Sequence, residues 1–236
     1  MSCSSLAKGD SYSGRLQDLG QILFRRYPKT AGCHGRYSAR AVVRDTPFDQ
    51  NHLVIRKRLQ RHDAPGTARF LTFSCYQRYP LFGNDAIKAE FVDRLERVST
   101  ELAVAVLAWV IMPNHIHLIV FSETTAIDDY LHKLKGPFSQ FVLRRWRALG
   151  APILHRLQTP DGHRFWQAGG GYDRNVMGEE LLEKVRYCHN NPVKHGLADT
   201  TVDWPWSSAR RYDERDDALG PAIAFDLVPR SRRWFT

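Results

Sequence analysis

The fold is decided by residues 109–120, Trp109-Val-Ile-Met-Pro-Asn-His-Ile-His-Leu-Ile-Val120. Pro113 and Asn114 are a turn signal, and the apolar, β-branched residues that follow predict a strand beginning at His115. Successive side chains of a strand point to opposite faces, so His115 and His117 project together, with Cα atoms about 7 Å apart. Neutral imidazole is the commonest side-chain metal ligand, so the pair could bind one ion. A bare His-x-His pair is nevertheless more often just part of a half-exposed strand, and the rest of the chain has to decide between these interpretations.

The composition favours a partner with many negative charges. The chain has 236 residues, of which 43% are hydrophobic, and a formal net charge of +9. Such an excess favours nucleic acid, although a merely basic protein would show it too. No apolar run is long enough to span a bilayer, and the first residues lack the order of a secretory signal. The four cysteines are scattered without C-x-x-C pairs, so we expect a cytoplasmic protein without disulfides, cysteine zinc sites or membrane contact.

The chain divides into three parts. Residues 1–66 carry basic clusters such as Arg56-Lys57-Arg58 and frequent breaks in periodicity, which predict a flexible basic extension. Regular periodicity starts after Gly66, and we expect one folded domain over residues 67–212. Residues 213–236 are expected to form a C-terminal tail.

Within that domain the hydrophobic periodicity predicts four strands and three helical regions. The expected strands cover residues 70–76, 104–110, 115–121 and 172–176. A first helix is expected after the capping residues Asn84 and Asp85, a second over 127–147 but split at Pro137, and a third over 179–190, ended by Pro192. The second has a basic face, formed by Lys133, Lys135, Arg144, Arg145 and Arg147. This order predicts an α+β, ferredoxin-like antiparallel sheet with helices on one face and an additional C-terminal helix.

Tyr187 lies off the apolar stripe of the last expected helix. It is about 200° round the helix from Val185, and it shares a polar face with Glu183 and Asn191, four residues away on either side. Such a tyrosine is either a surface residue or a functional one. Asn191 offers a carboxamide oxygen, a hard ligand suited to Mg²⁺ or Mn²⁺. Its direction stays open, because a residue before proline need not be fully helical.

Four sequence blocks occur in a characteristic order. They are Pro113-Asn-His-Ile-His-Leu-Ile-Val120, Arg164-Phe-Trp166, Tyr187-Cys-His-Asn-Asn-Pro-Val-Lys-His-Gly196 and Asp203-Trp-Pro-Trp-Ser-Ser208. Together, over about residues 67 to 210, the chain resembles the REP-associated tyrosine transposases, relatives of the small single-tyrosine HUH insertion-sequence transposases. That family cleaves single-stranded DNA beside repeated palindromic hairpins and holds the 5′ end as a phosphotyrosine.

The resemblance implies a role for each matching residue. His115 and His117 match the metal-binding pair, Tyr187 the nucleophile, and Asn191 the third ligand of Mg²⁺ or Mn²⁺. It implies metal-dependent nicking and rejoining of single-stranded or hairpin DNA by a nucleoid-associated protein. Smaller relatives are dimers that share sites between chains, and the longer C-terminal part here favours a monomer.

Two other functions stay open. One is a hairpin-DNA-binding protein without catalysis, and the other a His-x-His metallohydrolase that makes free phosphate ends. Only the transposase forms a covalent protein–DNA adduct. The residues also leave alternatives open: Glu183 as a proton acceptor, Trp204 and Trp206 as base-stacking or core residues, Lys194 and His195 as phosphate-binding or solvated. For Tyr172 we expect a strand-edge position, and for His189 a packing role.

Overall fold

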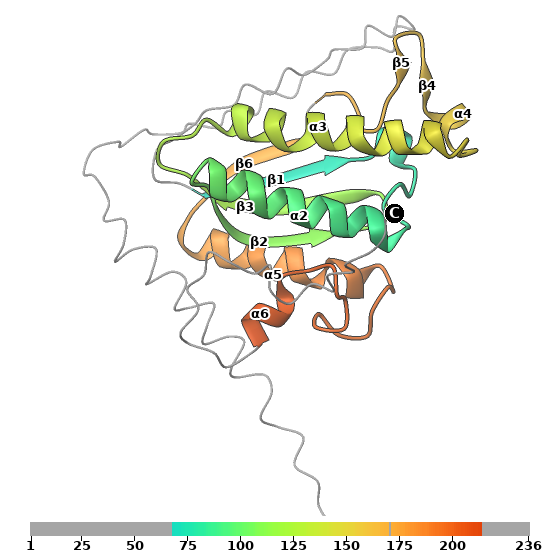
Figure 1. Cartoon of the computed structure of the whole chain (residues 1–236). Helices are drawn as coiled ribbons and strands as arrows, with labels where there is room; N and C mark the ends of the chain where they lie inside the picture. The colour runs from blue at the N-terminus through green and yellow to red at the C-terminus, as the bar shows by residue number, and fades with distance from the viewer. Residues whose placement is uncertain (1–67, 170, 214–236) are drawn as a thin grey trace, which may run out of the picture.

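The structure is a computed structural model that describes residues 68–169 and 171–213. The predicted extension (1–66) and, apart from Asp213, the predicted tail (213–236) lie outside the described residues. Four strands form one antiparallel sheet in the order β2-β3-β1-β6 (Figure 1). Their bounds are Ala68–Ser74 (β1), Ala105–Ile111 (β2), His115–Phe121 (β3) and Tyr172–Val176 (β6). With helices after β1 and β3, this is the predicted α+β, ferredoxin-like arrangement.

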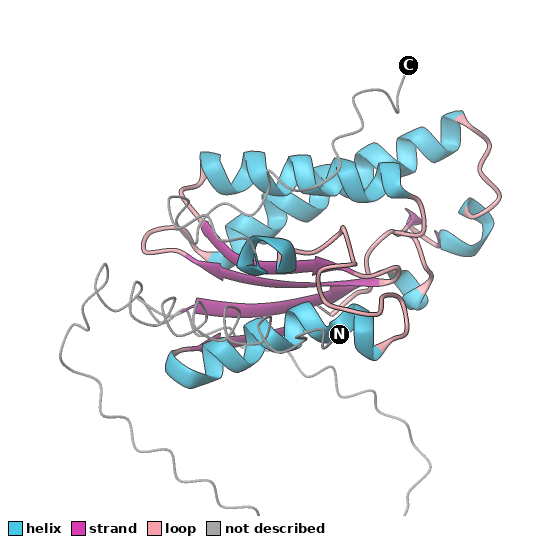
Figure 2. Ribbon diagram, turned by 90° about the horizontal axis from the view of Figure 1, so that it is seen from below, coloured by secondary structure: helices cyan, strands magenta, loops and turns pink. Residues whose placement is uncertain are grey.

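Helices pack on both faces of the sheet (Figures 1 and 2). One face is covered by α2 (Asp85–Glu101) and α3 (Ile127–Ala148), as predicted, and the additional helix α5 (Gly178–Lys194) lies on the other face. Successive side chains of β1 point to opposite faces of the sheet, so the strand contributes to both packing layers. Leu71 and Phe73 are buried with α2 and α3, whereas Phe70 is buried with the apolar stripe of α5. The remaining short elements are η1 (Tyr76–Arg78), α4 (Leu154–Leu157), β4 (Gln158–Thr159), β5 (Gly162–His163) and α6 (Ala209–Asp213).

The predicted break at Pro137 is wrong, because α3 runs through it without interruption. Proline removes one helical hydrogen bond, but Leu134 and Phe138 on either side of it are both fully buried. Packing of that continuous stripe therefore outweighs the lost bond. Two carbonyls near the proline also accept side-chain hydrogen bonds, Gly136 from Ser139 Oγ at 2.8 Å and Lys135 from Trp166 Nε1 at 3.0 Å.

The predicted end of the last helix is wrong in the same way. Helix α5 includes the buried Pro192 and continues to Lys194. The backbone N–H of His195 donates to the carbonyl of Asn191 at 3.1 Å, so the last turn is intact. Asn191 is therefore helical, and its direction is set by the same rigid element that carries Tyr187.

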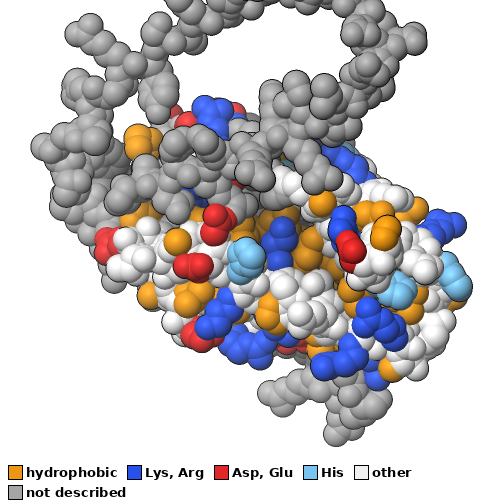
Figure 3. All heavy atoms as spheres, turned by 90° about the horizontal axis from the view of Figure 1, so that it is seen from above, with side chains coloured by type: hydrophobic (Ala, Val, Ile, Leu, Met, Phe, Trp, Pro, Cys, Tyr) orange, Lys and Arg blue, Asp and Glu red, His pale blue; other side chains and the backbone are white. Residues whose placement is uncertain are grey.

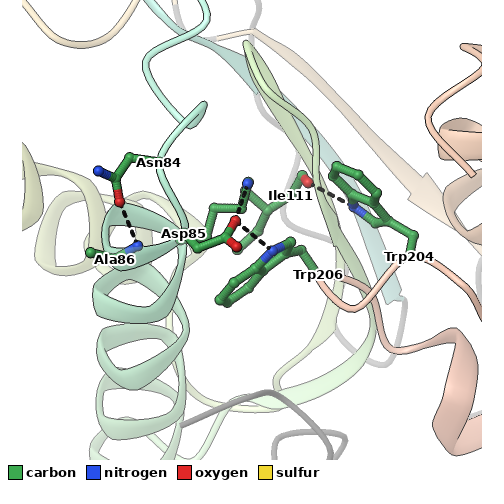
Figure 4. Close-up of polar contacts among 7 residues, drawn as sticks. Asn84, Asp85, Ala86, Ile111, Trp204 and Trp206 are labelled. Atoms are coloured by element: carbon green, nitrogen blue, oxygen red, sulfur yellow. Dashed lines mark hydrogen bonds and ion pairs between the residues drawn. The ribbon is translucent and has the colours of Figure 1, made fainter. Parts of the chain in front are cut away.

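The Trp204-Pro-Trp206 segment is a packing element. Trp206 is 4% exposed and donates from Nε1 to Asp85 Oδ1 at 3.0 Å, while Trp204 donates from Nε1 to the carbonyl of Ile111 at 3.0 Å (Figure 4). The ammonium of Lys88, paired with Asp85 at 2.7 Å, lies 5.6 Å and 5.4 Å from the centroids of the two indole rings. Figure 4 also shows the predicted cap, in which Asn84 Oδ1 accepts from the backbone N–H of Ala86. These contacts support the core interpretation of the tryptophans over base stacking.

In the part of the chain that the structure describes, no helix combines the length and apolarity that a membrane span requires.

Candidate functional site

The two histidines of β3 converge through one nitrogen each. The Nε2 atoms of His115 and His117 are 3.2 Å apart. The other ring nitrogens are engaged: Nδ1 of His115 lies 2.6 Å from Asn114 Oδ1, and Nδ1 of His117 lies 2.7 Å from Thr72 Oγ1. An amide oxygen only accepts, so Nδ1 of His115 carries the proton and its Nε2 bears a lone pair. Such outer hydrogen bonds orient metal-ligating histidines in proteins.

Tyr187 extends from α5 over the same strand. Its ring meets those of His117 and Phe70 edge-on, at centroid distances of 5.3 Å and 5.9 Å. The residue is 42% exposed, whereas Val185 and Cys188 on the buried side of α5 are fully buried. Its predicted position off the apolar stripe is thus confirmed, and its phenol borders both the histidines and solvent.

Asn191 fits the role of a third metal ligand. It is 2% exposed, and its Oδ1 has no hydrogen-bond partner among the described residues. An unpaired buried carbonyl oxygen is costly, so one beside two imidazole nitrogens suggests a site for a cation. Within the described ranges no three His, Cys, Asp or Glu side chains are grouped to hold a metal, so the amide oxygen would be the third protein ligand. A carboxamide oxygen is the kind of hard ligand that Mg²⁺ and Mn²⁺ take, and imidazole is a ligand of first-row transition metals.

These groups open into one cavity of about 670 Å³. Thr72, Asn114, His115, His117, Tyr187 and Asn191 all line it, together with the basic residues Arg78, Lys184 and His195. Of the described residues, no Asp or Glu lines it. Glu183 lies outside this cavity and pairs with Lys184 at 3.0 Å. The cavity therefore combines a candidate metal site, a tyrosine hydroxyl and positive charge.

The family model described as "Transposase IS200 like" matches residues 69–191, more than half of the chain, including both histidines, Tyr187 and Asn191. The chain belongs to the IS200-like transposase family. This confirms the relationship that the sequence blocks predicted.

Two curated proteins are similar to this chain. A REP-associated tyrosine transposase of Escherichia coli (strain K12) is 30% identical over 106 residues, covering 44% of this chain and 53% of the relative. A candidate REP-associated tyrosine transposase of Haemophilus influenzae is 26% identical over 164 residues, covering 64% and 85%. The chain thus spans about half the length of the first relative. The solved structure of a REP-associated tyrosine transposase bound to a REP hairpin matches with a TM-score of 0.50 and 21% identity, over 68% of this chain and 92% of that one. This match supports the fold.

Both histidines that line the cavity are neutral at pH 7. Burial is the main cause that lowers the pKa of His117 to about 3 and that of His115 to about 4. The charge of His195 lowers both further, and that of Arg78 lowers the pKa of His115, whereas the Asn191 side chain acts in the opposite direction. Neutral imidazole is the form that binds metal ions.

Sequence reasoning missed several residues of this site. Thr72 and Asn114 orient the histidines, but only the pairing of Thr72 with His117 across β1 and β3 shows which threonine does so. Arg78 and Lys184 also line the cavity without having been predicted. Lys194 and His195 had been left open as phosphate-binding or solvated residues, and of the two only His195 lines the cavity. Tyr172 begins β6, opposite Thr72 of β1.

His189, expected to pack, is fully buried on α5 with Nε2 2.7 Å from Ser208 Oγ. Complete burial lowers its pKa to about 3.

The burial of His189 makes folding stability depend on pH. Below pH 6.5 the unfolded chain binds a proton at this residue that the folded chain excludes. Folding stability therefore falls as pH falls, by about 1.4 kcal/mol per pH unit from this group. We predict that His189→Gln, which keeps a hydrogen-bonding side chain, shows a shallower loss of stability between pH 6 and 5 than the wild type. Urea denaturation with chelator present measures both slopes, and equal slopes would contradict the assignment.

Proposed function

We propose that this chain cleaves and rejoins single-stranded DNA beside palindromic hairpins, with Tyr187 as the nucleophile. The observation that carries the proposal is the contact between Tyr187 and His117, 5.3 Å between ring centroids, in a cavity where both Nε2 atoms converge. A tyrosine hydroxyl beside a candidate metal site can attack a phosphate that a bound ion would polarise.

The reaction is a transesterification at one phosphorus atom. The phenolic oxygen of Tyr187 forms a bond to phosphorus, and the bond from phosphorus to the 3′ oxygen breaks. The phenol loses a proton, which can leave to water on the exposed side of Tyr187, and the 3′ oxygen gains one. The products are a 5′-phosphotyrosine and a 3′ hydroxyl, and the reverse reaction with another 3′ end rejoins the DNA without a water nucleophile.

His115, His117 and Asn191 would hold Mg²⁺ or Mn²⁺. The bound ion would polarise a nonbridging oxygen of the scissile phosphate. Thr72 and Asn114 keep the imidazoles in one orientation through the 2.7 Å and 2.6 Å contacts at Nδ1. Contacts of Tyr187 with Phe70 and His117 restrict its ring in advance, which reduces the entropy lost at the reacting centre.

The partner that we propose is hairpin DNA with a single-stranded flank. A related transposase was solved with a REP hairpin bound, and the net charge of +9 suits a polyanion. All four proposed site residues come from one chain and line one cavity, which supports a monomer. A chromosomal substrate is consistent with the predicted cytoplasmic, nucleoid-associated location.

A labelled hairpin with single-stranded flanks, incubated with Mn²⁺, tests the proposed function on a denaturing gel. We expect a strand ending in a 3′ hydroxyl and an equal amount of protein-linked DNA. Free 5′-phosphate ends without protein-linked DNA would instead identify a metallohydrolase. Uncleaved but bound DNA would identify a hairpin-binding protein.

Affinity for the hairpin should fall steeply with salt. Each contact of Lys or Arg with a phosphate releases condensed counterions. On single strands, each contact therefore contributes about −0.7 to the slope of log affinity against log salt concentration. Figure 3 shows Lys and Arg side chains at several places on one face of the molecule. On α3, Lys133 pairs with Glu101 and Lys135 lies over Phe73 and Trp166, whereas Arg144 and Arg147 are exposed and have no such contact among the described residues. We predict a loss of about a hundredfold between 50 and 200 mM salt, measured by fluorescence anisotropy. Unchanged affinity over that range would contradict phosphate-dominated binding.

A further inference from the structure

The turn after β1 holds two consecutive residues in the left-handed region. Gln77 and Arg78 have φ angles of 48° and 56°, which residues other than glycine seldom adopt. Hydrogen bonds from a distant segment fix this turn: the N–H of Tyr76 donates to the carbonyl of Phe165 at 2.8 Å, and the N–H of Gln77 donates to Gln167 Oε1 at 2.9 Å. Strained conformations that the surrounding structure maintains are concentrated at functional sites. Here the turn places Arg78 on the wall of the cavity.

The register of the sheet gives the order of groups along the cavity. Tyr187 packs against Phe70 and His117, and His117 lies opposite Thr72 of β1. His115 lies two residues further along, opposite Ser74 at the end of β1. Arg78 follows in the turn beyond that end. The histidine pair therefore lies between Tyr187 and Arg78.

Arg78 brings positive charge to the end of the cavity away from Tyr187. Its side chain is exposed, and within the described residues it forms no ion pair. His195 lies at the same end, with its ring centroid 6.3 Å from that of His115. The side chains of Arg78 and His195 can both donate hydrogen bonds to an anion bound at this end.

We propose that Arg78 binds the phosphate next to the scissile one, on the strand that leaves with the 3′ hydroxyl. The inference rests on the proposed function. In phosphoryl transfer the attacking and leaving oxygens lie roughly in line, on opposite sides of phosphorus. Because Tyr187 attacks from one end of the cavity, the leaving strand extends toward the other end, where Arg78 lies. The guanidinium fork can donate two parallel hydrogen bonds to a phosphate. Arg78 thereby keeps the 3′ hydroxyl in place for rejoining.

A scan with neutral methylphosphonate linkages tests the proposal. Each phosphate of the single-stranded flank is replaced in turn, and binding to full-length wild type and Arg78→Ala is measured in excess chelator, so that no cleavage occurs. Cleavage by the wild type with Mn²⁺ separately maps the scissile bond. We expect Arg78→Ala to bind unmodified DNA about tenfold more weakly. The slope of log affinity against log salt concentration should become less steep by about 0.7. Neutralising the phosphate one nucleotide 5′ of the scissile bond should weaken wild-type binding and leave Arg78→Ala unaffected, because the same contact has already been removed.

Two matched variants distinguish loss of the Arg78 guanidinium from a change in the backbone of its turn and from loss of any exposed arginine. Gln77→Gly relaxes the same turn but keeps the guanidinium, and Arg97→Ala removes an exposed arginine from α2, on the other face of the sheet. Neither should reproduce the effect of Arg78→Ala. Coupling to a phosphate 3′ of the scissile bond, coupling to no phosphate, or an equal effect of either control variant would overturn the proposal. A single coupled phosphate without any cleavage would instead contradict the proposed function, and with it the leaving-strand assignment, while still locating a phosphate contact at Arg78.

Discussion

Replacing His117 by alanine is expected to lower the cleavage rate about 1,000-fold, the scale of losing a main electrostatic contact to the reacting phosphate. The variant removes one of two Nε2 atoms that lie 3.2 Å apart, so it should also lose Mn²⁺ binding, measured by electron paramagnetic resonance. Hairpin affinity should change little, because most affinity comes from phosphate and base contacts elsewhere. His115→Ala should behave in the same way.

Two further variants show whether metal binding is the cause. Thr72→Val removes the hydroxyl beside Nδ1 of His117 and should weaken Mn²⁺ binding by about 10- to 100-fold, the usual cost of an outer hydrogen bond at a metal site. His132→Ala removes an exposed histidine of α3 and should leave both metal binding and cleavage unchanged. Wild-type cleavage that continues in excess chelator would contradict the metal role.

Tyr187→Phe is expected to abolish protein-linked DNA while keeping the fold and the hairpin affinity. Phenylalanine preserves the ring that packs against Phe70 and His117, and it lacks only the oxygen that attacks phosphorus. Tyr172→Phe is the matched control and should form protein-linked DNA as the wild type does. Denaturing gels of labelled hairpin report the result. A shifted band that survives in Tyr187→Phe, or that disappears in Tyr172→Phe alone, would reverse the assignment.

Local sequence signals were sufficient for the sheet and for the residues that face one another along a single element. Residues 115–121 form the strand that their composition predicted, and the alternation of β1 places Leu71 and Phe73 as expected. Tyr187 and Asn191 share a helical face because four residues nearly complete one turn. Both errors at Pro137 and Pro192 came from treating proline as decisive. Buried side chains on either side keep α3 continuous through Pro137, and Pro192 is itself buried, as is Asn191 before it.

Groups that meet only through tertiary structure were not predictable. The hydrogen bond of Thr72 with His117 depends on strand register, and Asn114 was recognised only as a turn residue. Arg78 lies in the cavity because the distant Phe165–Gln167 segment holds its turn. The sequence left base stacking and a core role open for Trp206, because its partner Asp85, which accepts the indole N–H, lies more than a hundred residues earlier.

Mass spectrometry of the protein-linked DNA tests the central claim most directly. After cleavage with Mn²⁺, the protein is digested with nuclease and trypsin, and the peptides that carry nucleotide are identified. Trypsin releases Tyr187 in the peptide 187–194, where it is the only hydroxyl-bearing side chain, and Tyr172 in the peptide 165–174, where the same holds. The proposed mechanism predicts a nucleotide phosphate on peptide 187–194. The same mass on peptide 165–174, or on any peptide without Tyr187, would contradict it.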